Sequence, residues 1–352
     1  MKMHLLTLTL SLTTLAACGK DEAKPETKTA ATETTAPTPE TKPVPEAKPV
    51  APRDARIVAL FEAGKDCSWD AQGMTQCPTA KEIKDLAFNN QGSSELAASC
   101  AGALTDASPS VRGLAATCIQ GFNDNTRSPQ IGAGLDAFEA AKEPGMRRLM
   151  AWSFGRGNAT KAGFESRVIS LVEKLSGSED ENVNASYFFG TLFPQYMVNS
   201  APPSKEAGDF ALKIVKTSEG ALQKKAIEAL GLLTDREAEV CPVLVELTTE
   251  EMWPDTVPSM AKVGGACLED LDTILGFMMA KLNTGKFFAG HAMALRPLLR
   301  KASLSDEQFA ALKKASKTNL DAHKKTAYGN TAKKLMDEIA AYKDPALQPA
   351  AK

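Results

Sequence analysis

The feature that most constrains the fold is an apolar helical pattern that recurs along the chain. Its clearest example places Val111, Leu114, Ala115, Cys118, Ile119 and Phe122 on one face of an α-helix. The pattern returns with first apolar residues at Val111, Met146, Val183, Leu222, Val257, Phe288 and His323. These positions are 35, 37, 39, 35, 31 and 35 residues apart. A near-constant period of this length predicts stacked pairs of helices.

The residues around these positions support the same interpretation. Four residues beyond each one, the side chain is mostly small, at Ala115, Met150, Tyr187, Ala226, Ala261, Ala292 and Ala327. Helix-breaking residues fall between the expected helices, at Pro144, Gly177, Pro202, Pro203, Gly220, Pro254 and Gly285. The sequence therefore predicts helices that approach one another closely, with turns at regular intervals.

Two segments carry a family resemblance. The stretch Asp106-Ala107-Ser108-Pro109-Ser110-Val111-Arg112 resembles the junction of a HEAT-type repeat, and residues 226–233 resemble its second helix. In that family the Asp caps and braces the turn and the Arg reaches along the stack. The resemblance implies an all-α, right-handed α-solenoid of about seven antiparallel helix pairs over residues 54–345. The period is nearer that of the tetratricopeptide repeat, but the Trp-Leu-Gly-Tyr pattern is missing, and an irregular helical bundle is the structural alternative.

The N-terminus predicts an exported protein. Lys2 precedes an apolar stretch from Leu5 to Leu15 that is too short to span a bilayer. The following Leu15-Ala16-Ala17-Cys18 resembles the signal of bacterial lipoproteins, which implies removal of residues 1–17 and acylation of Cys18. Since Gly19 is not Asp, the resemblance implies the outer membrane, facing the periplasm. The expected partner at this end is therefore the membrane, held through the lipid.

The next segment has the composition of a disordered spacer. Residues 18–53 interleave proline with Thr, Lys, Glu and Ala and contain no aromatic residue. Such a chain cannot form a core, and at about 3.1 Å per residue in polyproline geometry it reaches on the order of 100 Å. We also expect residues 346–352 to form a disordered tail.

Six further cysteines, an even number, suit an oxidising compartment. They are Cys67, Cys77, Cys100, Cys118, Cys241 and Cys267. Helix geometry favours sequential pairing, because Cys100 and Cys118 lie on the apolar stripes of two helices that share a short turn. Cys241 and Cys267 would meet in the same way, and Cys67 and Cys77 would close a small structured insertion. Zinc ligation and free buried thiols are the competing interpretations, and the spacing is too wide for a usual zinc site.

The sequence contains no catalytic constellation, so we expect no enzyme, no cofactor and no metal. His291 and His323 fall in different helices without a ligand at metal spacing and are expected to pack or lie at the surface. Gly132-Ala133-Gly134 mimics a dinucleotide fingerprint, but no strand precedes it, and we expect a loop entering a helix. The run Glu179-Asp180-Glu181 is expected to cap the following helix.

Charge is distributed unevenly towards the C-terminus. Between Glu228 and Asp272, eleven acidic residues face two basic ones, a net charge of −9. Between Lys281 and Lys334, twelve basic residues face three acidic ones, a net charge of +9. The candidate face for an anionic partner comprises Lys313, Lys314, Lys317, Lys324, Lys325, Lys333 and Lys334. Mutual attraction of solvated helix faces is the alternative.

These features predict a lipid-anchored envelope scaffold that binds a protein partner and has no catalytic chemistry. The alternatives are a module for an anionic envelope glycan or lipid, bound by the basic repeats, and a HEAT-type lyase. The overall net charge of −2 does not favour nucleic acid.

Overall fold

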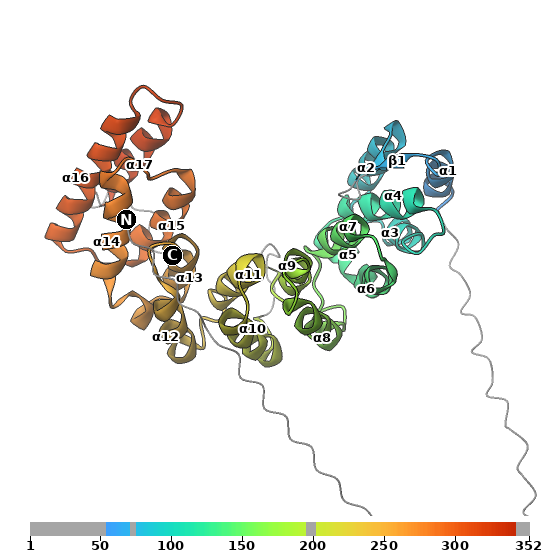
Figure 1. Ribbon diagram of the computed structural model, residues 1–352, viewed down its shortest axis with the longest axis horizontal. Helices are drawn as coiled ribbons and strands as arrows, with labels where there is room; N and C mark the ends of the chain where they lie inside the picture. Colours follow the sequence, from blue (N-terminus) through green and yellow to red (C-terminus); the bar gives the residue numbers. More distant parts are fainter. Residues whose placement is uncertain (1–53, 71–74, 195–201, 343–352) are drawn as a thin grey trace, which may run out of the picture. The chain divides into compact units, whose positions relative to one another are not determined.

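The computed structural model describes residues 54–70, 75–194 and 202–342. The predicted signal segment, Cys18, the linker and the tail lie outside the described residues. The described residues belong to one compact unit and are all-α apart from one short β-hairpin. The predicted fold class is thus confirmed as all-α (Figure 1).

The first half of the helical region runs from α1 to α9. Its elements are α1 (Ala55–Ala63), β1 (Ser68–Trp69), β2 (Thr75–Gln76), α2 (Pro78–Asn89), α3 (Ser94–Ala101), α4 (Pro109–Gln120), α5 (Asp124–Arg127), the 3-10 turn η1 (Ser128–Gln130), α6 (Ile131–Ala140), α7 (Pro144–Phe154), α8 (Glu165–Ser176) and α9 (Asn182–Gly190). The two strands pair antiparallel, with Ser68 opposite Gln76.

The second half runs from α10 to α17. Its elements are α10 (Lys205–Thr217), α11 (Gly220–Leu230), α12 (Glu237–Leu247), α13 (Trp253–Val263), the 3-10 turn η2 (Gly265–Leu268), α14 (Leu271–Asn283), α15 (Ala289–Lys301), α16 (Asp306–His323) and α17 (Gly329–Ala341).

The second helix of each pair packs on the second helix of the next. This ladder runs from α2 through α4, α7, α9, α11, α13 and α15 to α17 (Figure 1). The first helices pack on their own partners, as α8 does on α9 and α10 on α11. The core is one continuous cluster of buried side chains along the ladder. This is the nearest-neighbour packing that the period predicts.

The regular pairing changes after α13, where α14 packs mainly on α16 and not on the following helix α15. The prediction for the seventh unit was wrong at this point. His323 is the last residue of α16 and does not begin a second helix, and Ala327 is exposed in the turn before α17. The cause is the length of α16, which has 18 residues, so its own apolar positions were mistaken for those of the next helix.

The turn between α3 and α4 shows how local chemistry sets a helix boundary. The Ser108 side chain is the N-cap, and Pro109 occupies the first turn, where its missing N–H costs no hydrogen bond. Asp106 braces the turn by accepting a hydrogen bond from Ser108 N at 2.9 Å. Arg112 donates to Asp106 O at 2.9 Å and also pairs with Glu143, before α7, at 3.6 Å. The cap is therefore Ser108, while the Arg does reach along the stack.

The next junction repeats this arrangement with different residues. Arg147 in α7 pairs with Glu181, the residue before α9, at 2.7 Å, and its guanidinium lies 4.0 Å from the centre of the Phe138 ring. Burial opposes the charge on Glu181, but hydrogen bonds from Arg147 and Asn184 outweigh it and lower the Glu181 pKa. Glu181 thus occupies the N-cap position of α9, but its side chain makes no cap hydrogen bond and serves instead as a bridge between helix pairs.

Two glycines allow close helix packing. Gly132 and Gly134 lie inside α6, so the expectation of a loop was wrong. A Cβ at Gly134 would meet the Phe154 ring at 2.4 Å, and one at Gly132 would meet the Phe164 ring at 2.5 Å. The glycines therefore serve aromatic packing in the core.

Candidate binding surfaces

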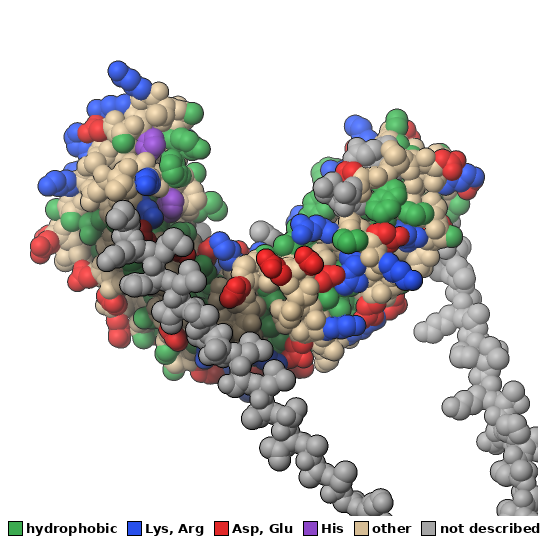
Figure 2. All heavy atoms as spheres, in the orientation of Figure 1, with side chains coloured by type: hydrophobic (Ala, Val, Ile, Leu, Met, Phe, Trp, Pro, Cys, Tyr) green, Lys and Arg blue, Asp and Glu red, His purple; other side chains and the backbone are tan. Residues whose placement is uncertain are grey.

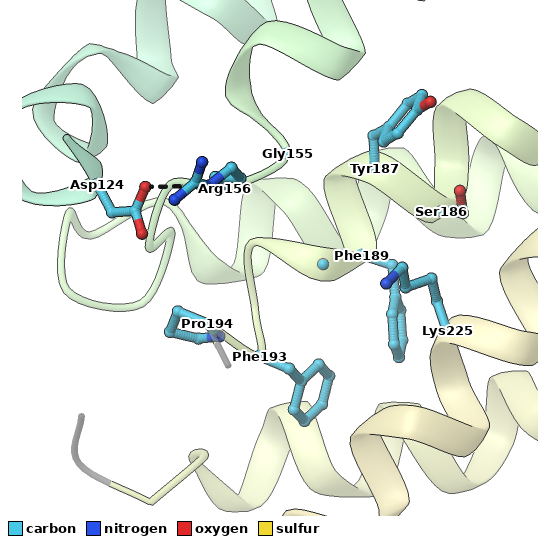
Figure 3. A pocket seen from close by; sticks show the side chains of 10 residues that line it. Asp124, Gly155, Arg156, Ser186, Tyr187, Phe189, Phe193, Pro194 and Lys225 are labelled. Carbon is cyan, nitrogen blue, oxygen red and sulfur yellow. Dashed lines mark ion pairs between the residues drawn. The ribbon is translucent and has the colours of Figure 1, made fainter. Parts of the chain in front are cut away.

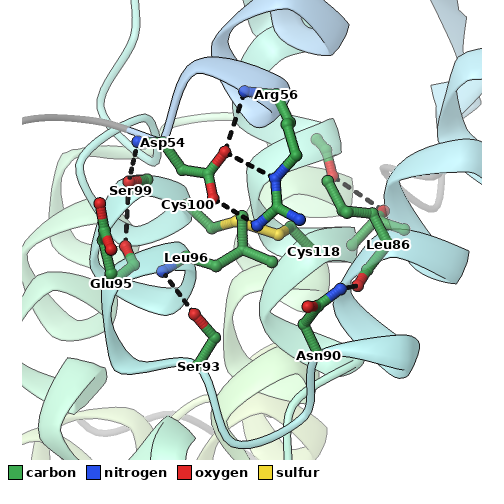
Figure 4. The surroundings of a disulfide bond; sticks show 12 residues. Asp54, Arg56, Leu86, Asn90, Ser93, Glu95, Leu96, Ser99, Cys100 and Cys118 are labelled. Carbon is green, nitrogen blue, oxygen red and sulfur yellow. Dashed lines mark hydrogen bonds and ion pairs between the residues drawn. A yellow bond between two sulfur atoms is a disulfide. The ribbon is translucent and has the colours of Figure 1, made fainter.

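The first disulfide joins the two helices of the α3/α4 pair. Cys100 and Cys118 are fully buried, with their Cα atoms 6.1 Å apart. Figure 4 shows the start of α1 beside this bond. Asp54 N donates to Ser99 Oγ at 2.8 Å, and the Asp54 carboxylate accepts from Arg56, which lowers the Asp54 pKa. The disulfide thus lies next to the hydrogen bond that ties the beginning of α1 to α3.

The other two disulfides have the pairing that the sequence favours. Cys67 and Cys77 flank the β-hairpin, with Cα atoms 5.8 Å apart. Ser110 Oγ donates to Cys67 O, which ties the insertion to α4. Cys241 in α12 meets Cys267 in η2, with Cα atoms 4.6 Å apart. Each of the three disulfides therefore links residues within one local unit. The six cysteines form these bonds in the structure instead of the zinc site or free thiols of the competing interpretations.

The seven lysines of the predicted anionic-partner face are all exposed. Lys313, Lys314 and Lys317 lie on α16, Lys333 and Lys334 on α17, and Lys324 and Lys325 in the turn between them. Asp321 pairs with Lys317 at 2.8 Å and with Lys324 at 2.6 Å, and these bonds lower the pKa of Asp321 to about 2. Within the described residues the other five lysines form no ion pair.

The expected attraction between the acidic and basic segments is limited. Lys281 in α14 pairs with Glu250 of the acidic segment at 3.0 Å. Most basic side chains of the last two pairs point to solvent instead of neutralising the acidic helices. Their charge is therefore available to a partner.

A pocket opens at the C-terminal ends of α7 and α9. Figure 3 shows its lining, with the Phe189 and Phe193 rings, Gly155 and Gly190, and the cationic side chains of Arg156 and Lys225. Phe189 and Phe193 are buried, and the Tyr187 ring packs against Gly155. The pocket thus combines an aromatic floor with a charged rim.

Acidic neighbours hold both rim cations. Arg156 Nε lies 3.5 Å from Asp124 Oδ1, and Lys225 Nζ bonds Glu228 at 2.6 Å. The Asp124 Oδ1 atom is buried and accepts no hydrogen bond from the described residues. A ligand with a donor group facing Asp124 and an apolar side chain over the rings would match this lining.

Trp152 is exposed near the C-terminal end of α7, one helical turn after the exposed Arg148 and four residues before Arg156, which follows the C-cap Gly155. Trp152 is 46% exposed although it stands in the ladder of second helices. The Arg148 guanidinium has no partner among the described residues. A large exposed aromatic ring between two cations is typical of a protein-binding hot spot.

The two histidines belong to an aromatic cluster between α13 and α17. The His291 ring lies 5.3 Å from the Trp253 and Phe287 rings, and Phe288 lies 5.7 Å from His323 and 5.2 Å from Tyr328. His323 Nε2 donates to Gly285 O at 2.7 Å. The expectation that the histidines pack is therefore met.

The sequence analysis missed the pocket and the aromatic cluster. The available signal was the unusual aromatic content of residues 187–193 and 287–288, in a chain with only 6% aromatic residues. Helical spacing alone could not separate the rings that enter the core from those that reach a surface.

Among the described residues, no group of His, Cys, Asp and Glu is placed to hold a metal ion. No described helix combines the length and apolar character needed to cross a membrane. Neither a protein-family model nor a curated protein matches the chain.

Proposed function

We propose that this protein is a non-enzymatic scaffold of the bacterial cell envelope that binds a segment of another protein along its second helices. The observation that carries the proposal is the exposed Trp152 on α7, three residues before Gly155, which lines an aromatic pocket rimmed by Arg156 and Lys225. Exposed aromatic rings and Arg side chains dominate the binding energy of many protein interfaces.

The proposal includes the location and the finer architecture. We infer that Cys18 carries the lipid, that the linker tethers the helical unit, and that the anchor lies in the outer membrane with the unit in the periplasm. We also infer a right-handed HEAT-like solenoid of about seven pairs. The ladder of second helices and the bridging roles of Arg112 and Arg147 support this inference.

Site-specific crosslinking tests the binding face. A photoreactive residue at Trp152 is expected to capture a specific envelope protein in intact cells. The matched control is Val245, which is 42% exposed on α12, a first helix. Equal capture from both positions, or none from Trp152, would contradict the proposed face.

Cys18→Ala tests the location. We expect this variant to lose acylation and to leave the membrane fraction. A membrane-bound, lipid-labelled variant would refute the anchor.

A second candidate function is binding of an anionic envelope glycan or lipid through the basic C-terminal helices. The five lysines that lack an ion pair within the described residues favour it, because their charges are not neutralised internally. Charge reversal at Lys313 and Lys314 is expected to weaken such binding, measured on purified anionic polymers and vesicles at low and high salt.

A further inference from the structure

A second surface lies at one end of α15, where the turn before it meets the turn between α16 and α17. We call it the aromatic-basic tip, and it comprises Lys286, Phe288, Lys324, Lys325 and Tyr328. Phe288 is 40% and Tyr328 is 49% exposed. Figure 2 shows hydrophobic side chains gathered beside the two histidines, with basic side chains around them. Large apolar side chains grouped in this way mark an interaction site.

The tip is supported from beneath by the aromatic cluster. His291 Nδ1 accepts a hydrogen bond from Phe288 N at 3.0 Å, and the His291 ring stacks on the fully buried Trp253. Phe288 in turn contacts Tyr328 and His323, which come from the other turn. The exposed rings are therefore held in place by buried ones and do not hang on a free loop.

The charges around the rings are almost all positive. Lys286 stands two residues before Phe288, and Lys324 and Lys325 share a turn with Tyr328. Asp321 partners Lys324, while Lys286 and Lys325 form no ion pair within the described residues. All three cations are lysines, which act as mobile point charges and do not impose the planar geometry of arginine.

We propose that the aromatic-basic tip docks on an anionic lipid surface, with Phe288 and Tyr328 entering the headgroup region and the three lysines contacting lipid phosphates. The inference rests on the second proposed function and specifies that its anionic ligand is a lipid. The rings and lysines are grouped at turns and at the beginning of a helix, whereas the shaped pocket lies between α7 and α11. Apolar side chains ringed by lysines match the interfacial layer of a membrane, where each lysine adds electrostatic attraction.

Vesicle sedimentation tests the tip. The chain from residue 18 onwards carries Cys18→Ser, so that neither the apolar segment Leu5–Leu15 nor an acyl chain contributes, and is mixed with vesicles of phosphatidylcholine with and without phosphatidylglycerol. Lys286→Glu/Lys325→Glu is expected to lower partitioning into the anionic vesicles by at least about 30-fold, since removing each lysine near such a surface costs about five-fold and the added glutamates are repelled. Because both side chains are exposed, this variant keeps the fold. Phe288→Ser/Tyr328→Ser is expected to lower partitioning about ten-fold, with the circular dichroism spectrum as the check on folding.

The matched control is Lys84→Glu/Phe88→Ser, which removes an exposed lysine and an exposed ring from α2. We expect it to bind as tightly as the parent chain. Equal losses in the control and tip variants would overturn the inference, as would equal binding to neutral vesicles. If only Lys313→Glu/Lys314→Glu weakens binding, the second function stands and the tip inference fails. Tip-dependent capture of polyglutamate without vesicle binding would assign the surface to an acidic protein instead.

Discussion

The N-terminal region, residues 54–120, and the C-terminal region, residues 271–342, are both built from packed helices. Different interactions join the helices in the two regions. Two of the three disulfides lie in the first region. The described part of the second region has no disulfide, and its helices are joined by the Arg296–Glu338 ion pair, by the Tyr342 hydroxyl donating to Ala302 O and by the contact between the Phe288 and Tyr328 rings. A covalent staple holds short helices without large side chains, as in α3, which has 8 residues.

The difference has a consequence for function. Where rings stabilise the helices, some of them lie at the edge of the core and remain exposed, as Phe288 and Tyr328 do. The stapled region contains fewer rings, and one of them, Phe88, is also exposed, at 63%. We therefore expect substitutions to affect stability most in the N-terminal region and binding most in the C-terminal one.

The largest expected effect is the loss of the Cys100–Cys118 bond. Cys100→Ser/Cys118→Ser is expected to lower the free energy of unfolding by about 3 kcal/mol, the chain-entropy value for a loop of this size. Circular dichroism should still show a helical protein. Hydrogen exchange should rise in α3 and α4 and stay unchanged in α14–α17, and the reverse distribution would break the comparison.

An intermediate effect is expected at the bridge between α7 and α9. Arg147→Met removes the partner of Glu181 and is expected to cost about 2 kcal/mol, because both side chains are largely buried. The matched control is Arg167→Met, whose more exposed pairs should contribute less than about 1 kcal/mol.

The same bridge predicts a pH dependence. The Glu181 pKa is lowered in the folded state, so its contribution is present above the unfolded value of 4.5 and is lost as the pH falls through the folded value. The stability difference between the wild-type chain and Glu181→Gln should therefore shrink on acidification below this pH. A stability difference that stays constant on acidification would show that the ionised Glu181 does not contribute to stability through this bridge.

A smaller effect is expected at His291 in the aromatic cluster. Burial and the nearby Lys281 lower the His291 pKa, so the unfolded state binds the proton more readily. Stability should fall as the pH drops from 7 through the unfolded value of 6.5, by about 1 kcal/mol or less. His291→Phe keeps a ring in the stack and should abolish this dependence in thermal unfolding curves.

The smallest effect on stability is expected on the basic face. Lys313→Glu/Lys314→Glu should change the free energy of unfolding by less than about 0.5 kcal/mol, because both side chains are exposed. Chemical denaturation measures this directly. A larger loss would show that these lysines stabilise the C-terminal region instead of serving a partner.

The sequence by itself determined the helical class, the approximate period and the cysteine pairs. These properties depend on local spacing: apolar residues at helical intervals define the buried stripe, and cysteines on adjacent stripes of one pair lie within reach of each other. The same local rule failed at His323, because a long helix and the first turn of a following one have the same periodicity.

The tertiary structure alone decided which aromatic rings line the pocket, which lie exposed on a helix and which form the aromatic-basic tip. Phe189 and Trp152 come from neighbouring helices of the ladder, yet one is buried and the other is 46% exposed. It also paired α14 with α16 and brought Phe288 against Tyr328 across 40 residues of chain. Such contacts depend on the angle and distance between helices, which are set by the summed packing of many side chains and are not encoded in the spacing along one helix.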